Sequence, residues 1–419
     1  MQTYRRTTCR LCDSSNVELV VKLAPIPMAE NYCSSSEEGK NAPLFPVDVY
    51  MCSDCGHVQQ LDVIDVQSLW SNYTYHSGMA KGMLKHFQEV YAGICRDFQF
   101  PQGSLIVDIG SNDGSLLRPF RDAGHQVLGV DPAQNIASYA TSKGIPTIAQ
   151  SMSSALAQQI VQKYGKAHVV CMFNAFAHMD NLRDILLSVR ILLHSQGIFV
   201  FESQYLADII DKKLIATIFH EHMSHHSLCA LAKFFESCDM ELVDVRRASI
   251  QHGSIIGVVQ HRGGAHPVRS TVKSLLCMER ERSLDKLCTL RAFAADIADM
   301  RRRITAWSTE CRSQGAHVAG FGAARSGPTL IAQLGLEGII EYIFDDHPQK
   351  VGFYTSGEGT PIVPSRELYA RMPTYTVVLA WVHAEKIIET HRRYLDKGGS
   401  FVVLCPEPRI VSREGEQPL

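Results

Sequence analysis

The sequence contains no apolar stretch long enough to cross a membrane. None of its apolar runs approaches the roughly 20 residues that a transmembrane helix needs. The first residues, MQTYRRTTCR, also lack the apolar stretch of a signal peptide. We therefore expect a cytoplasmic protein without a membrane partner.

An excess of basic charge is also missing. The 41 Lys and Arg residues are balanced by 43 Asp and Glu residues, which gives a formal net charge of -2 at pH 7. Because nucleic-acid binders normally carry a basic surface, this balance argues against a nucleic-acid partner. No fixed-period repeat and no low-complexity tract is present, so the 419 residues predict two to three ordinary globular domains.

Four of the 13 cysteines form two C-x-x-C pairs, Cys9 with Cys12 and Cys52 with Cys55. In the cytosol, cysteines are more often thiols or metal ligands than disulfides. Four thiolates in two such pairs satisfy tetrahedral zinc and leave no coordination position open. We therefore expect a structural Zn²⁺ ion in a loop-rich module over residues 1–72. Free loop cysteines and a redox pair are the weaker alternatives.

The central part of the chain alternates between apolar, β-branched runs and helical segments, which predicts a mostly parallel, doubly wound α/β sheet. A helix is expected over 81–97. Strands are expected at 104–109, 126–131, 168–173 and 197–203, with helices near 115–123, 133–143, 152–164 and 181–194. Two more strands, 241–247 and 255–260, are expected to form a terminal hairpin.

The C-terminal part begins with a long charged stretch, 268–313, whose periodicity predicts one or two connecting helices. Four strand candidates follow, HVAGFGAA, IIEYIFDD, TYTVVLAW and SFVVLCP, with helical segments between them. This order predicts a second, smaller α/β domain.

A glycine-containing loop, VDIGSNDG, follows the first of the central strands. Gly110 and Gly114 allow the backbone to approach a ligand at the carboxyl end of that strand. Asp131 ends the next strand, where its carboxylate can accept both ribose hydroxyls of an adenosine. The loop departs from G-x-G-x-x-G, and Asp108 would repel a pyrophosphate but can face a methionine ammonium. The loop, including Asn112, therefore favours S-adenosylmethionine over NAD.

Two polar segments follow later in the chain. Asn174 and His178 come directly after the strand expected at 168–173, where His178 is either a substrate-facing group or a helix cap. Residues 218–227 read IFHEHMSHHS and include His220, Glu221 and His222. Histidine and glutamate are the side chains of general base catalysis near neutral pH. A second metal site and ordinary packing histidines are the alternatives.

Taken together and in this order, the motifs resemble a known family along essentially the whole chain. They are the cysteine pairs, DIGSNDG, N-x-x-A-H at 174–178, F-H-E-H at 219–222, G-x-G-A at 320–323, D-D-x-P at 345–348 and L-A-W at 379–381. This set resembles the zinc-containing, S-adenosylmethionine-dependent C-methyltransferases of nucleotide-linked keto-deoxysugars. The resemblance implies a zinc module over 1–72, a class I methyltransferase core over 73–265, and a helical connector with a Rossmann-like, nucleotide-sugar-binding domain over 266–419.

The resemblance also implies roles for single residues. His222 would be the general base, aided by Glu221, by His178 in the same pocket, and by Tyr73 or Tyr75. The implied cofactor contacts are Asp108, Gly110, Asn112, Gly114, Asp131 and Asn174. The implied substrate contacts are Phe219, His220, Arg325, Ser326 and Asp345.

The chain departs from the family pattern at three places. Phe219 replaces a tyrosine, AARSGPT at 323–329 replaces a loop with a Lys-Gly-Asn core, and SGEG at 356–359 replaces a Pro-Gly-Thr-His turn. The expected function is C-methylation next to the ketone of a dTDP-linked keto-deoxysugar by a monomeric enzyme. The alternatives are an N- or O-methyltransferase on a related sugar and a catalytically impaired sugar-nucleotide-binding homologue.

Overall fold

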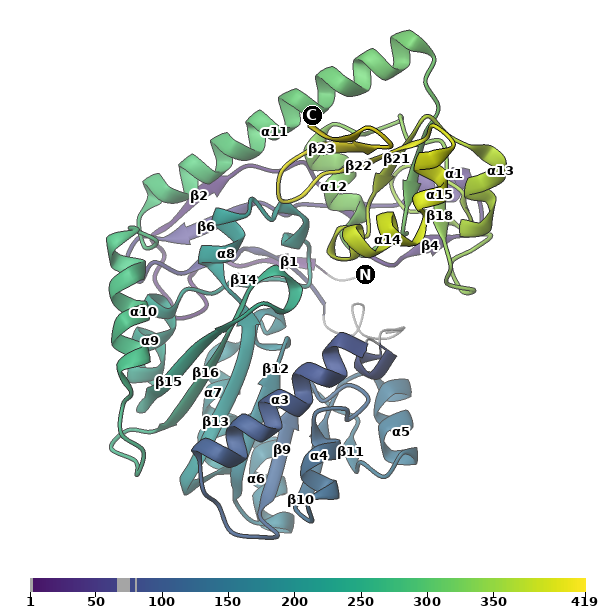
Figure 1. Ribbon diagram of the computed structural model, residues 1–419. Coiled ribbons are helices and arrows are strands. Elements are labelled where there is room, and N and C mark those ends of the chain that lie inside the picture. Colours follow the sequence, from purple (N-terminus) through teal and green to yellow (C-terminus); the bar gives the residue numbers. More distant parts are fainter. Residues whose placement is uncertain (1–2, 66–75, 80) are drawn as a thin grey trace.

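The structure is a computed structural model that describes residues 3–65, 76–79 and 81–419 (Figure 1). Its N-terminal module consists mainly of short antiparallel strands. Its largest sheet contains β2 (Val17–Val21), β6 (Val49–Cys52) and β7 (Val58–Gln60). A fourth strand comes from far along the chain, because β14 (Ser224–His225) pairs with β7. The segment that follows F-H-E-H is therefore part of the N-terminal sheet.

Three two-stranded pieces complete this module. They are β1 (Thr3–Arg5) with β8 (Asp62–Ile64), β3 (Ile26–Pro27) with β5 (Leu44–Phe45), and β4 (Tyr32–Cys33) with β19 (Tyr354–Thr355). A short helix, α1 (Ser36–Lys40), begins after Ser35, whose side chain accepts a hydrogen bond from the Glu38 amide. Since β19 lies in the C-terminal part of the chain, the module pairs with strands of both other parts.

The central sheet has the strand order β11-β10-β9-β12-β13-β16-β15. Neighbouring strands from β11 to β13 run parallel, whereas β16 runs antiparallel to both β13 and β15. The bounds are β9 (Leu105–Ile109), β10 (Gln126–Val130), β11 (Thr147–Ile148), β12 (Ala167–Phe173), β13 (Leu193–Gln204), β15 (Met240–Ala248) and β16 (Ser254–His261). The doubly wound sheet and its terminal hairpin are thus confirmed.

Helices cover both faces of this sheet, because successive strand residues point to opposite sides. Ile106 packs in one cluster with Val90 of α3, and Val107 packs in another with Leu186 of α7. The helices are α3 (Lys81–Asp97), α4 (Leu117–Asp122), α5 (Gln134–Ser142), α6 (Ser154–Tyr164), α7 (Leu182–Leu192), α8 (Leu206–Asp211) and α9 (Leu228–Ser237). The helix expected to reach residue 194 ends at Leu192, where β13 begins earlier than expected.

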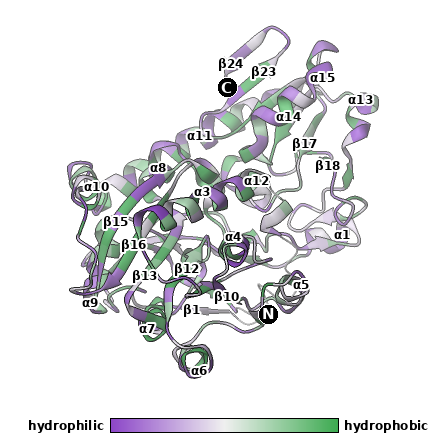
Figure 2. Ribbon diagram, turned by 60° about the horizontal axis from the view of Figure 1, so that its bottom comes forward, coloured by the Kyte–Doolittle hydropathy of each residue, from purple (hydrophilic) through white to green (hydrophobic). Residues whose placement is uncertain are grey.

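The charged stretch forms two helices, α10 (Ser270–Glu281) and α11 (Leu287–Gln314), and α11 runs along the N-terminal sheet and on to the C-terminal domain (Figure 1). The buried apolar residues of α11, such as Phe293 and Ile304, pack into the hydrophobic cluster that joins the N-terminal and C-terminal parts. Within the described residues no helix combines the length and the apolar character needed to cross a membrane. Figure 2 shows where the hydrophobic residues lie: the hydrophobic colour is concentrated on the central strands.

The C-terminal domain contains a second sheet of order β20-β18-β17-β21-β22-β23-β24, parallel as far as β22. Its strands are β17 (Val318–Phe321), β18 (Ile343–Asp345), β20 (Ile362–Pro364), β21 (Tyr375–Val378), β22 (Ser400–Val403), β23 (Arg409–Ser412) and β24 (Gly415–Pro418). Its helices are α12 (Gly327–Leu334), α13 (Leu368–Arg371), α14 (Ala384–Thr390) and α15 (Arg392–Asp396). The second α/β domain is confirmed, and β20, β23 and β24 were not expected.

Candidate active site

The two cysteine pairs meet in one cluster. The four Sγ atoms of Cys9, Cys12, Cys52 and Cys55 all lie within 4.8 Å of one another. The second pair sits on a tight turn in which the Gly56 amide donates to the Cys52 carbonyl at 2.9 Å, and Gly56 adopts a φ of 80°. Four soft thiolates that converge in this way fit a tetrahedral Zn²⁺ ion, whose role with a closed coordination shell is structural.

The conformation of the loop after β9 depends on Gly110 and on the carboxylate of Asp131. Gly110 has a φ of 74°, and a Cβ atom there would lie 2.6 Å from the Cβ of Ala175. The Asp131 carboxylate accepts hydrogen bonds from the backbone amides of Asn112 and Ala133, each at 2.9 Å. The residue that follows β10 therefore fixes the shape of the loop that follows β9. Gly114, later in the same loop, has a φ of 75°.

A small cavity opens beside this loop at the carboxyl ends of β9 and β12. Asp108, Gly110, Asn112 and Asn174 line it, so four residues expected to bind the cofactor converge there. Burial, and secondarily Asp131, raises the pKa of Asp108 to about 8. The Oδ1 atom of Asp108 is buried and makes no hydrogen bond within the described part of the chain. A cationic group, such as a methionine ammonium, would satisfy this atom and favour its charged form.

His222 has a defined tautomer. Its Nδ1–H donates to the Thr217 carbonyl at 2.6 Å, which leaves Nε2 as the proton acceptor. Enclosure by protein lowers the pKa of His222 to about 4; the Thr217 hydrogen bond opposes this shift and the Arg325 charge adds to it. The ring of Phe219 lies against the imidazole, with 4.1 Å between centroids. His222 is therefore neutral near pH 7 and has the geometry of a general base.

Glu221, which was expected to aid His222, makes the polar contacts of its carboxylate with another residue. Its carboxylate is paired with Arg325 of the C-terminal domain, and Arg325 Nη2 also lies 2.6 Å from an Oε2 atom of Glu30. Burial raises the pKa of Glu221, and the Arg325 charge opposes that shift. The group that orients the imidazole is thus the Thr217 carbonyl, and Glu221 joins the F-H-E-H segment to the C-terminal domain.

Other expected substrate contacts are spread over the junction. His220 points into the N-terminal module, where its Nε2 atom lies 3.2 Å from the Phe45 carbonyl. Asp345 accepts hydrogen bonds from the amides of Ala323 and His347, each at 2.7 Å. Ser326 is 8% exposed and directly precedes α12. The expected tyrosines at 73 and 75 lie outside the described residues.

Several residues of the site were missed from the sequence. Thr217 acts through its carbonyl, which any residue type would supply, so no side-chain signal marks it. Glu30 lies in a loop of the N-terminal module and meets Arg325 only in the fold. Asp113 could have been found, since it belongs to the DIGSNDG loop; its Oδ2 atom accepts from the Gly78 amide at 2.8 Å and links the loop to the short helical turn Ser77–Met79.

Comparison with known proteins gives a consistent assignment. The sequence model of a zinc binding domain matches residues 9–70, that of a methyltransferase domain matches 83–245, and that of a C-methyltransferase C-terminal domain matches 249–406. The chain is 32% identical to the C-methyltransferase NovU of Streptomyces niveus over 407 residues, which cover 97% of each protein.

Solved structures resemble part of the chain more distantly. The magnesium protoporphyrin IX methyltransferase of Synechocystis is 17% identical, with a TM-score of 0.35 over 47% of this chain and 92% of that one. A S-adenosylmethionine-dependent methyltransferase of Clostridium acetobutylicum is 10% identical, with a TM-score of 0.34 over 42% and 91%. These likenesses are too low to carry an argument, whereas the full-length relative is decisive. The chain therefore belongs to the C-methyltransferase family that NovU represents, and it is a S-adenosylmethionine-dependent methyltransferase with an N-terminal zinc-binding domain.

Proposed function

We propose that this enzyme methylates the carbon next to the ketone of a nucleotide-linked keto-deoxysugar, with dTDP as the nucleotide and His222 as the general base. The observation that carries the proposal is the hydrogen bond from His222 Nδ1 to the Thr217 carbonyl, which leaves Nε2 free to take a proton. Methylation of carbon needs such a base, because a C–H group has no lone pair with which to attack.

The reaction begins with proton transfer from the carbon next to the ketone to His222 Nε2, and the resulting charge spreads onto the carbonyl oxygen. S-adenosylmethionine supplies the electrophilic methyl group when bound. The imidazole then holds the proton while the new carbon–carbon bond forms and the carbon–sulfur bond breaks. His178 stacks on His222 with 5.2 Å between ring centroids, which makes it a candidate to stabilise the oxygen. Phe219 cannot do so, because it lacks a hydroxyl.

A second cavity supports binding of an extended substrate between the modules. It has a volume of about 290 Å³ and is mainly apolar. Pro25, Met28 and Tyr32 line it from the N-terminal side, and Pro328 and Ile331 line it from α12. The Tyr32 hydroxyl donates to the Ala323 carbonyl at 2.8 Å, so this wall joins the loop that precedes Arg325. Glu30 also lines this cavity and pairs with Arg325, so the cavity lies next to the Glu221–Arg325 pair.

The test uses a dTDP-linked keto-deoxysugar in heavy water with S-adenosylhomocysteine in place of the methyl donor. The wild-type enzyme should exchange one ring hydrogen for deuterium, and His222→Gln should lose both this exchange and methylation. His317→Gln is a matched control, since His317 is exposed and pairs only with Glu341 in the described contacts. Full methylation by His222→Gln without exchange in either enzyme would identify a heteroatom acceptor, and binding without methylation would identify an impaired homologue.

A further inference from the structure

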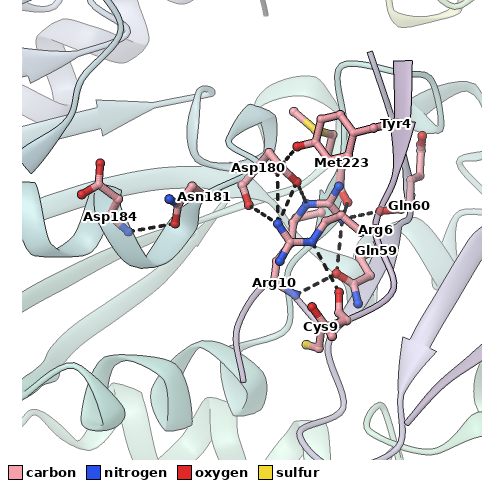
Figure 3. A network of polar contacts seen from close by, with 12 residues as sticks. Tyr4, Arg6, Cys9, Arg10, Gln59, Gln60, Asp180, Asn181, Asp184 and Met223 are labelled. Atoms are coloured by element: carbon pink, nitrogen blue, oxygen red, sulfur yellow. Dashed lines mark hydrogen bonds and ion pairs between the residues drawn. The ribbon is translucent and has the colours of Figure 1, made fainter. Parts of the chain in front are cut away.

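The first cysteine turn carries a buried arginine that zinc binding does not require. Arg10 lies between Cys9 and Cys12, and its side chain has an exposed fraction of 0%. Figure 3 shows its guanidinium inside a polar network between the N-terminal module and the methyltransferase core. Arginine keeps its charge at neutral pH, and this side chain carries that charge into the interior beside Asp180. A buried charge needs compensating partners, and those partners identify its role.

The guanidinium of Arg10 binds two segments of the core. Its Nε atom donates to Asp180 Oδ1 at 3.0 Å, and its Nη1 atom donates to the Met223 carbonyl at 3.3 Å. Nη1 also donates to the Gln60 carbonyl and to Gln59 Oε1 (Figure 3). The Gln60 amide donates to the same Met223 carbonyl at 2.9 Å. Arg10 thus ties β7 and both core segments to the backbone of the cysteine turn.

Both core segments carry the imidazoles of the active site. Asp180 follows His178 by two positions, and Met223 directly follows His222. The side chain of Gln60 donates to the Phe219 carbonyl at 3.1 Å, and the His222 amide donates to that carbonyl at 2.9 Å. Arg10 therefore contacts the backbone after His222, at Met223, and Gln60 contacts the backbone before it, at Phe219.

We propose that Arg10 is a positioning residue through which the zinc site sets the separation of His178 and His222; this inference rests on the proposed role of His222 as base. Zinc bound by Cys9 and Cys12 fixes the backbone of Arg10 between them. The planar guanidinium, with donors in a rigid fork, transmits that position to Asp180 and Met223. The metal thus contributes to catalysis without touching the reactants.

The test compares Arg10→Met with Arg6→Met in zinc-loaded, full-length protein. Arg6 Nη1 contacts the same carboxylate of Asp180 at 3.2 Å but makes no contact with Met223 among those described, which makes it a matched control. We would measure zinc content, S-adenosylmethionine affinity, kcat, and the ¹⁵N resonances of the His178 and His222 imidazoles. Arg10→Met should keep zinc and cofactor affinity, lose kcat on the order of ten- to a hundredfold, and shift both sets of resonances. Arg6→Met should leave the His222 resonances in place, because Arg6 contacts only the Asp180 side of the pair.

A third variant keeps the test decisive if Arg10→Met loses zinc. Asp180→Asn removes the charge of the acceptor from the core side, outside the cysteine turn. A loss of kcat together with shifted resonances in that variant supports the inference. Unchanged kcat and unchanged resonances in zinc-loaded Arg10→Met, or in Asp180→Asn, would overturn it.

The two proposals fail in different ways. The imidazole resonances report the geometry of His178 and His222 whatever the substrate, whereas the activity of His222→Gln reports the need for a base. An active His222→Gln enzyme would remove the proposed function and leave the resonance test intact. An inactive His222→Gln enzyme, combined with an unaffected Arg10→Met enzyme, would remove only the positioning role.

Discussion

The imidazoles of His178 and His222 stack with their centroids 5.2 Å apart and 16° between their planes. They come from different segments, one after β12 and the other before β14. Enclosure lowers the pKa of His178 well below its ordinary value, and the neighbouring His222 lowers it further. Two positive charges this close repel each other, and the pKa values of both rings are lowered. The stacked pair is therefore neutral at physiological pH.

The pH profile of the reaction should reflect this pair. The pKa of His222 is lowered to about 4, so the base is deprotonated and competent above that value. With S-adenosylmethionine saturating, so that ionisation of Asp108 does not limit the rate, activity should be lost as the pH falls through about 4, and no limb should occur near the ordinary histidine value. The measurement is kcat/KM against pH by brief transfer from neutral stocks, with circular dichroism confirming that the fold persists. A limb near pH 6.5 would show that the imidazole is solvated in solution.

Replacing Phe219 by tyrosine tests the missing hydroxyl. The Phe219 ring lies against His222, and the side chain is buried with 7% exposed, so an added hydroxyl would be placed beside the imidazole inside the protein. Phe219→Tyr should keep activity or raise it modestly, because the proposed mechanism assigns stabilisation of the enolate oxygen to another group, such as His178. Initial rates and deuterium exchange measure this, with Phe219→Leu as the control for lost packing. A large loss in Phe219→Tyr would mean that the apolar ring itself is required.

Much of the fold could be predicted from local pattern. The central strands were placed to within a few residues because each is a short apolar run bounded by turn residues, and helix α3 was predicted at its observed bounds. The cysteine cluster was predictable because ligand spacing is itself a local property. The cofactor loop was predictable because glycine and acidic residues follow consecutive strands.

What could not be predicted depends on contacts between distant segments. Nothing local indicates that Ser224 pairs with Gln59, since a two-residue strand has no periodicity. The ion pair of Glu221 with Arg325 joins two domains, and the tautomer of His222 depends on a backbone carbonyl. The help that Glu221 was expected to give His222 stays a prediction, because the polar contacts of its carboxylate lie with Arg325 of the other domain.

Loss of one cysteine ligand should release the metal. Cys52 is fully buried in the cluster, and the N-terminal module has only short strands to hold it together. Cys52→Ser should therefore lose zinc and lower the melting temperature, because metal binding and folding are coupled in small modules. Elemental analysis and thermal unfolding measure this, with Cys95→Ser as the control because Cys95 is exposed and outside the cluster. Protein that contains no zinc before mutation would contradict the assignment.

Removal of the Asp131 carboxylate should weaken S-adenosylmethionine binding. Its two oxygens hold the amides of Asn112 and Ala133, and the same group is expected to accept the ribose hydroxyls. Asp131→Ala should cost about 1.5–3 kcal/mol of binding free energy, as for a charge-assisted hydrogen bond. Calorimetry measures the change. Asp345→Asn is the matched control, because Asp345 makes the equivalent amide contacts in the other domain and should leave cofactor affinity unchanged.

Cofactor binding should release a proton from Asp108. Burial raises the pKa of this carboxyl to about 8, so most chains carry a proton there at pH 7 before the cofactor binds. The cofactor's α-amino group, with an ordinary pKa of about 7.7–8.0, is mainly charged at that pH. Contact with this cation favours the carboxylate and lowers its pKa, so close to one proton per chain should leave on binding. Calorimetry in buffers of different ionisation enthalpy counts this proton. Asp108→Asn should bind more weakly and release none, and release of the same number of protons by Asp108→Asn would place the titrating group elsewhere.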